Sequence, residues 1–128
     1  MDGKLSIIVN GATGNMGKQT LITLGENPES MQVVGVVSQS ISTSFLEDNN
    51  LDREILVSQT LSDLLKTTTP DLLIDFSIRE SAMESAAICA ENNIDFITGT
   101  SGLTESDIST LKSLVNKNNV GIFVAPNF

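Results

Sequence analysis

The stretch from Leu5 to Gly17 constrains the fold of this chain more than any other part of its sequence. A mainly apolar run of strand length, residues 5–9, ends shortly before Gly11, and two further glycines follow at intervals of three residues. Glycine lets the backbone turn sharply and come close to a phosphate group, while the free N–H groups at a helix start face the anion. The order of strand, glycine turn and helix therefore predicts a phosphate-binding βα turn.

The spacing of these glycines differs from the usual dinucleotide fingerprint. Gly11, Gly14 and Gly17 form G-x-x-G-x-x-G, whereas the common pattern is G-x-G-x-x-G, and only the interval from Gly14 to Gly17 agrees with it. Without a ligand, the same triplet is an ordinary tight turn. The strand before it and the helical pattern after it favour the nucleotide site, in which Gly17 lets the helix pack closely on the strand.

Composition and charge exclude several classes of function. The 128 residues fit one domain, with 16 acidic and 7 basic side chains and a net charge of −9. This balance argues against binding to nucleic acid or to an anionic membrane through a basic face. The sequence shows no signal-peptide pattern and no apolar run near the ~20 residues that span a bilayer, so we expect a soluble, cytoplasmic protein. The single cysteine, Cys89, is expected to pack in the core.

The sequence contains no histidine, tyrosine or tryptophan. A histidine acid, a histidine metal ligand and a tyrosine–lysine reductase pair are therefore impossible within this chain. We predict no catalytic residue and no metal site in it.

Apolar segments of strand length alternate with helical patterns along the whole chain. Thr60 and Thr104 are candidate residues for starting helices, and Ser77 with Glu80 has the spacing of a capping box. Residues 41–53 look like a polar surface excursion. We expect strands at residues 5–9, 31–37, 55–57, 71–76, 95–98 and 120–124, a short helix from Thr60, and longer helices ending near residues 26, 92 and 116. The apolar face of the first helix is expected to comprise Met16, Leu21, Ile22 and Leu24.

This alternation implies parallel strands joined by right-handed crossovers. We therefore predict an α/β fold with a doubly wound, mainly parallel, Rossmann-like sheet and helices on both faces. Ligands of such sheets bind at the carboxyl ends of the strands. The loops at that edge are residues 11–17, 38–40, 76–77, 99–102 and 125–128.

The second expected strand ends in Ser38, Gln39 and Ser40. A dinucleotide-binding fold usually has an Asp or Glu here that binds the adenosine ribose hydroxyls. Its absence removes the repulsion of a 2′-phosphate, and serine hydroxyls can donate to one, although no Arg or Lys lies nearby. We expect NADPH or NADH as cofactor, with a slight preference for NADPH. The alternative is a plain polar loop.

Four blocks of residues together resemble one family, dihydrodipicolinate reductase (4-hydroxy-tetrahydrodipicolinate reductase). They are Val-x-Gly-x-x-Gly-x-Met-Gly at residues 9–17, Ile-Asp-Phe-Ser at 74–77 with Glu80, Gly-Thr-Ser-Gly at 99–102, and Ala-x-Asn-Phe at 125–128. The order and spacing of the blocks match across the whole chain. The resemblance implies an oxidoreductase that reduces a cyclic dicarboxylate with NAD(P)H in diaminopimelate and lysine biosynthesis.

The resemblance also implies roles for individual residues. The glycine turn holds the diphosphate, Phe76 and Ser77 border the nicotinamide half, and Ser101 reaches towards the substrate carboxylate. The implied cofactor-binding residues are Gly11, Ala12, Thr13, Gly14, Asn15, Met16, Gly17, Ser38, Phe76, Ser77, Gly99, Thr100, Ala125, Asn127 and Phe128. We interpret Asp75 as a carboxylate that orders a loop rather than as a catalytic acid.

The chain departs from the family pattern in several places. Asn15 stands where the family often has Arg, Ser38 where many members have an acid, and Arg79 where Pro is common. The sequence also ends where the family enters its second domain. The resemblance therefore implies that residues 1–128 form the NAD(P)H-binding domain, without the domain that binds substrate and forms the homotetramer of the full-length enzyme. We expect this part to bind nucleotide without turning over substrate.

Two other families of function are compatible with parts of the sequence. The extended short-chain reductases also begin with Gly-Ala-Thr-Gly-x-x-Gly, as residues 11–17 do, but they need a tyrosine that this chain lacks. A non-catalytic module that binds or senses a nucleotide or coenzyme A remains the alternative. It predicts binding without any complementing catalytic domain.

Overall fold

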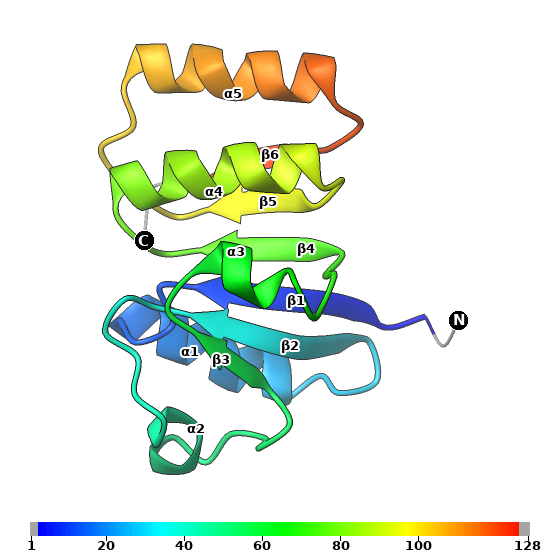
Figure 1. Ribbon diagram of the computed structural model, residues 1–128, viewed down its shortest axis with the longest axis vertical. Helices are drawn as coiled ribbons and strands as arrows, with labels where there is room; N and C mark the ends of the chain where they lie inside the picture. Colours follow the sequence, from blue (N-terminus) through cyan, green and yellow to red (C-terminus); the bar gives the residue numbers. More distant parts are fainter. Residues whose placement is uncertain (1–2, 126–128) are drawn as a thin grey trace.

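Six parallel strands form one sheet in the computed structural model, which describes residues 3–125 (Figure 1). The sheet order is β3-β2-β1-β4-β5-β6, and all five neighbouring pairs are parallel. The strands are β1 Leu5–Asn10, β2 Met31–Val37, β3 Leu56–Ser58, β4 Leu72–Asp75, β5 Asp95–Thr98 and β6 Ile122–Val124. This arrangement confirms the predicted doubly wound α/β sheet.

The helices of the described residues cover both faces of the sheet (Figure 1). They are α1 Asn15–Gly25, α2 Phe45–Asp48, α3 Leu61–Leu64, α4 Arg79–Glu91 and α5 Glu105–Lys117. Side chains alternate along β1, so Ile7 and Val9 belong to the apolar cluster that includes residues of α1 and α2, while Ile8 belongs to the cluster that includes residues of α3, α4 and α5. None of the helices within residues 3–125 is both long and apolar enough to cross a membrane.

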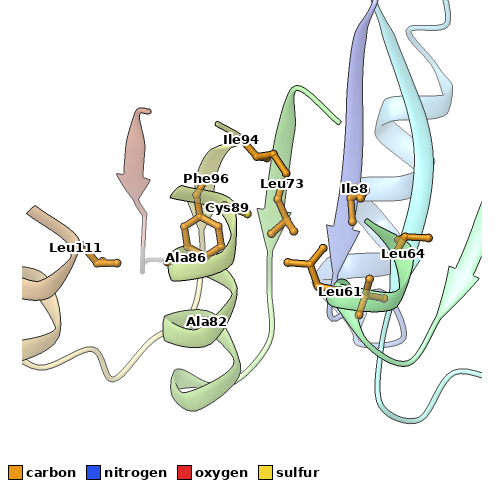
Figure 2. Close-up of a cluster of buried hydrophobic side chains, with 11 residues drawn as sticks. Ile8, Leu61, Leu64, Leu73, Ala82, Ala86, Cys89, Ile94, Phe96 and Leu111 are labelled. Carbon is orange, nitrogen blue, oxygen red and sulfur yellow. The ribbon is translucent and has the colours of Figure 1, made fainter. Parts of the chain in front are cut away.

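One apolar cluster fills the space between the sheet and α3, α4 and α5 (Figure 2). Leu73 of β4 and Phe96 of β5 share this cluster with small residues of α4, among them Ala86 and Cys89. Small side chains let the helix lie close to the sheet. Cys89 is fully buried, as predicted. Burial, with a smaller contribution from the charge of Asp75, raises the pKa of its thiol to about 12.

Two of the three predicted helix starts are confirmed. Thr60 accepts a hydrogen bond from the Asp63 amide, and Thr104 forms a full capping box with Asp107. The predicted capping box at Ser77 is wrong, because α4 is capped by Ile78 without any side-chain hydrogen bond. Ser77 lies one residue before this cap, and its Oγ donates to Asp75 Oδ1 at 2.5 Å and to Ile78 O at 3.3 Å.

The first turns of α4 and α5 are joined by an ion pair. Arg79 Nε lies 2.6 Å from Asp107 Oδ2, and its Nη2 lies 2.9 Å from Oδ1. The guanidinium, followed by the Thr104 amide, lowers the pKa of the Asp107 carboxyl to about 2. Arg79, which departs from the family pattern, therefore contacts α5.

Three further expectations need correction. Leu21 and Leu24 of α1 are buried, but Met16 and Ile22 are 40% and 52% exposed, because they lie off the face that meets the sheet. The polar segment 41–53 contains the four-residue helix α2, whose buried Phe45 and Leu46 are too few to produce a periodic pattern. The last strand begins at Ile122 rather than at residue 120.

Candidate functional site

The carboxyl ends of β1 and β4 lie side by side at the centre of the sheet. Asn10 and Asp75, the last residues of these strands, are partners in the register. After β1 the chain moves through α1 to β2 on one side, whereas after β4 it moves through α4 to β5 on the other (Figure 1). Loops that leave a parallel sheet in opposite directions open a crevice, and ligands of such sheets bind there.

Gly11 allows the loop after β1 to touch the loop after β4. Its φ is +77°, which favours glycine, and a Cβ atom placed on it would lie 2.7 Å from the carbonyl carbon of Phe76. The role predicted for Gly17 is confirmed, since a Cβ there would collide with the carbonyl oxygen of Gly11 and lie 2.8 Å from Ala12 Cα. Both glycines are therefore required by packing.

Gly14 differs from these two glycines. Its φ of −77° suits any residue, and the nearest atom to a Cβ placed on it would be Gly11 O at 3.6 Å, an ordinary van der Waals distance. The residue is exposed, it starts α1, and no side chain caps this helix. Neither its backbone conformation nor packing therefore requires glycine here, and no side chain caps the N–H groups of this 11-residue helix. These properties fit a diphosphate, which needs free N–H groups and close approach to the backbone.

Three hydroxyl groups meet between this turn and the end of β2. Thr13 Oγ1 lies 2.7 Å from Ser38 Oγ and 3.2 Å from Ser40 Oγ. Ser38 is nearly buried, with 9% of its surface exposed. The position where a ribose-binding acid is common is thus occupied by hydroxyl groups that can each donate one hydrogen bond.

Asp75 holds the loops that follow β4 and β5. Its Oδ1 accepts hydrogen bonds from Asn10 Nδ2 at 2.9 Å and from Ser77 Oγ at 2.5 Å. Its Oδ2 accepts from Thr98 Oγ1 and from Thr100 Oγ1, both at 2.7 Å. The carboxylate is fully buried. The expectation that Asp75 orders a loop is confirmed.

A cleft of about 520 Å³ runs along this edge of the sheet. The glycine turn, the hydroxyl groups of Thr13 and Ser38, and the Phe76–Ser77 loop line it. It continues between the start of α3 and the side of α4, where Glu84 contributes a carboxylate. Its mixture of backbone, hydroxyl and apolar groups suits a ligand with a diphosphate group.

Comparison with known proteins identifies the family. The profile described as "Dihydrodipicolinate reductase, N-terminus" matches residues 5–128. The chain belongs to the dihydrodipicolinate reductase family. It corresponds to the N-terminal, nucleotide-binding domain of that family.

Curated proteins similar to this chain are 4-hydroxy-tetrahydrodipicolinate reductases. The chain is 33% identical over 124 residues to a 4-hydroxy-tetrahydrodipicolinate reductase of Dehalococcoides mccartyi, covering 97% of this chain and 47% of that protein. It is 30% identical over 131 residues to the corresponding reductase of Methanococcus aeolicus, covering 97% of this chain and 48% of that one. The chain therefore spans about half the length of the curated relatives it matches.

Solved structures agree with this assignment. A dipicolinate-bound dihydrodipicolinate reductase from Paenisporosarcina sp. TG-14 superposes with a TM-score of 0.79 at 27% identity, covering 97% of this chain and 48% of that one. The WlbA dehydrogenase of Bordetella pertussis, in complex with NADH and UDP-GlcNAcA, reaches a TM-score of 0.80 at 14% identity, covering 94% of this chain and 36% of the other. The second similarity shows the fold alone.

The residues predicted for the site of this nucleotide-binding domain lie in several different environments. Those that line the cleft are Gly11, Thr13, Gly14, Ser38, Phe76 and Ser77. Ala12 and Gly17 are buried in the turn, whereas Asn15 and Met16 are exposed on the first turn of α1. Gly99, Thr100 and Ser101 lie in the loop after β5, and Ala125 N donates to Thr98 O at 2.8 Å. Asn127 and Phe128 lie outside the described residues.

The cleft also contains residues that the sequence interpretation missed. Gln59 and Thr60 are two of them; they follow β3, and their position after a strand at the same edge could have identified them. Four more recur along α4 at intervals of one, three or four positions, which is one helix face, and are Ser81, Glu84, Ser85 and Ile88. The sequence did not indicate this helix face, because it combines polar serine with apolar isoleucine and so has no uniform hydropathy.

Proposed function

We propose that this domain binds NAD(P)H across the carboxyl edge of its sheet, with the diphosphate on the Gly11–Gly14 turn. The observation that carries the proposal is that position 14 is a glycine although neither backbone conformation nor packing requires one there. A bound diphosphate would require it, since a side chain would stand between the phosphates and the N–H groups of α1. Asn15 and Met16 add the N–H groups of the first helical turn.

The two halves of the cofactor are proposed to extend in opposite directions from this turn. The adenosine half lies towards Ser38 at the end of β2, where this fold binds the ribose. The nicotinamide half lies towards Phe76 and Ser77, with Gly99 and Thr100 behind it. The ends of β5 and β6 would complete this side, through Ser101 for the substrate carboxylate and Ala125, Asn127 and Phe128 for the nicotinamide.

We further propose a slight preference for NADPH over NADH. Ser38, Ser40 and Thr13 present hydroxyl groups that can donate to a 2′-phosphate. An acid at the same place would repel that phosphate and accept from the ribose hydroxyls of NADH instead.

The reaction proposed for the full-length protein is the reduction of a cyclic dicarboxylate in lysine and diaminopimelate biosynthesis, in the cytoplasm. When bound, NAD(P)H supplies a hydride from C4 of its nicotinamide. This domain orients that carbon by holding the diphosphate and the flanking loops. We propose that the part of the full-length protein corresponding to the remaining half of the relatives supplies the proton, makes most of the contacts with the substrate and forms a homotetramer. The 128 residues alone are therefore expected to bind cofactor without turnover.

Isothermal titration of the chain with NADPH and NADH tests this proposal. The wild type should bind both, and Gly14→Val should abolish binding. Gly25→Val, at the other end of α1 and with no atom within 4 Å of its Cβ position, should leave binding unchanged. Equal affinity of both variants would contradict the proposal. Binding of coenzyme A in place of either dinucleotide would support the non-catalytic alternative.

A further inference from the structure

We propose that Asp75 is a positioning residue that holds a buried negative charge behind the nicotinamide and favours its oxidised, cationic form. The inference rests on the proposed function, because it takes the cleft to be a dinucleotide site. It gives an electrostatic role to a carboxylate that makes no direct contact with the cofactor in the proposed function.

Among the described residues, the surroundings of Asp75 offer hydrogen-bond donors but no opposite charge. Every hydrogen bond to the carboxylate comes from a neutral group: the amide of Asn10, the hydroxyl and N–H of Ser77, and the hydroxyls of Thr98 and Thr100. Within residues 3–125 it takes part in no ion pair. Since the carboxylate is fully buried, water screens its field weakly.

Asp75 lies on the side of the cleft that is proposed for the nicotinamide half of the cofactor. Ser77 Oγ, which donates to Asp75 at 2.5 Å, belongs to a residue that lines the cleft, so the carboxylate lies one hydrogen bond behind the wall. Asp75 ends β4, and the adenosine half is assigned to β2, on the far side of β1. The charge therefore acts on the nicotinamide half.

A negative charge beside the nicotinamide would affect its two redox forms differently. The reduced ring is neutral and the oxidised ring carries one positive charge. A bound NAD(P)H would supply a hydride, with both electrons of its C–H bond, to the acceptor carbon of the substrate, and its ring would become a cation. The buried carboxylate stabilises this developing positive charge, as a fixed dipole or charge does in other preorganised sites.

Asp75→Asn removes the charge and preserves the shape of the network. The amide oxygen can accept from Asn10 and Ser77, while its NH₂ can donate to the hydroxyl oxygens of Thr98 and Thr100, which can rotate. Two control variants separate charge from structure. Asp71→Asn removes the same charge at the opposite, exposed end of the same strand. Thr100→Val keeps the charge and removes one hydrogen bond to Asp75.

The experiment measures dissociation constants for NADP⁺, NADPH, NAD⁺ and NADH by calorimetry. Asp75→Asn should weaken binding of the oxidised forms about tenfold and leave the reduced forms within about twofold of wild type. Thr100→Val should change both forms by the same factor, and Asp71→Asn should change neither. An equal effect of Asp75→Asn on both redox forms, or no effect, would overturn the inference while leaving the proposed function intact. If the wild type binds no dinucleotide, the proposed function fails and the inference fails with it.

Discussion

Asn10 Nδ2 lies 2.9 Å from Asp75 Oδ1, and this buried hydrogen bond joins the last residues of β1 and β4. The same amide group lies 3.2 Å from Ser85 Oγ of α4. The bond therefore ties together the two strands from which the chain departs in opposite directions, directly below the cleft. Its loss should affect both the stability of the sheet and the position of the Ser77 loop.

Asn10→Ala should lower the free energy of unfolding by about 1–3 kcal/mol, because it leaves a buried carboxylate oxygen with one donor fewer and opens a small cavity. Urea denaturation followed by circular dichroism measures this change. Asn27→Ala is the matched control, since its Nδ2 bonds a carbonyl on the exposed end of α1. Equal losses of unfolding free energy in the two variants would show that the buried Asn10–Asp75 hydrogen bond stabilises the fold no more than the exposed bond of Asn27.

The ion pair between Arg79 and Asp107 predicts a particular dependence of stability on pH. The pKa of Asp107 is lowered from 3.8 to about 2 in the folded chain, chiefly by Arg79. A lowered carboxyl pKa means that the stabilisation is complete above about pH 4 and is lost as the pH falls towards 2. The difference in unfolding free energy between wild type and Asp107→Asn should thus be constant from pH 7 to 5 and shrink below pH 4.

Urea titrations of both proteins across this pH range test the prediction. In an Arg79→Leu background, Asp107→Asn should produce a smaller and flatter difference, because the main cause of the lowered pKa is gone. A difference that stays constant down to pH 2 would refute the assigned role of Asp107.

Substitutions of Gly11 and Gly14 by alanine should lower the stability of the fold by different amounts. Gly11→Ala should lower the free energy of unfolding by about 2–5 kcal/mol, because it combines an unfavourable positive φ with a contact 2.7 Å from the Phe76 carbonyl. Gly14→Ala should cost less than about 1 kcal/mol, since only the preference at a helix start changes. Thermal and urea unfolding of the two variants would measure both losses of stability. A Gly14→Ala variant as unstable as Gly11→Ala would show that packing, and not a ligand, explains this glycine.

The sheet could be predicted from the sequence because its evidence is local. Each strand buried on both faces is a continuous apolar run, and the long helix α5 begins after a residue with a clear preference for that place. Thr104 illustrates this, since its hydroxyl and the Asp107 carboxylate close a capping box within four residues. The helix α2 escaped prediction because only Phe45 and Leu46 of its four residues are apolar and buried.

The site could be predicted only in part because its hydrogen bonds depend on strand register. Asn10, Asp75 and Thr98 are distant in sequence and become neighbours only when β1, β4 and β5 pair in register. The sequence rule for Ser77 considers only the helix that follows, but in the structure the cap is Ile78, one residue later, and Ser77 Oγ donates to the buried Asp75. The position of this helix start therefore depends on contacts that the local pattern does not contain.

Ser38→Asp should reverse the proposed cofactor preference. The new carboxylate would stand at the end of β2, beside Thr13 Oγ1, where it repels a 2′-phosphate and accepts hydrogen bonds from free ribose hydroxyls. Calorimetry should show NADPH affinity falling by at least about tenfold relative to NADH, the equivalent of about 1.4 kcal/mol. Ser42→Asp introduces the same charge on an exposed residue outside the cleft and should leave the ratio unchanged. If both variants shift the ratio equally, the effect comes from overall charge, and Ser38 does not contact the adenosine ribose.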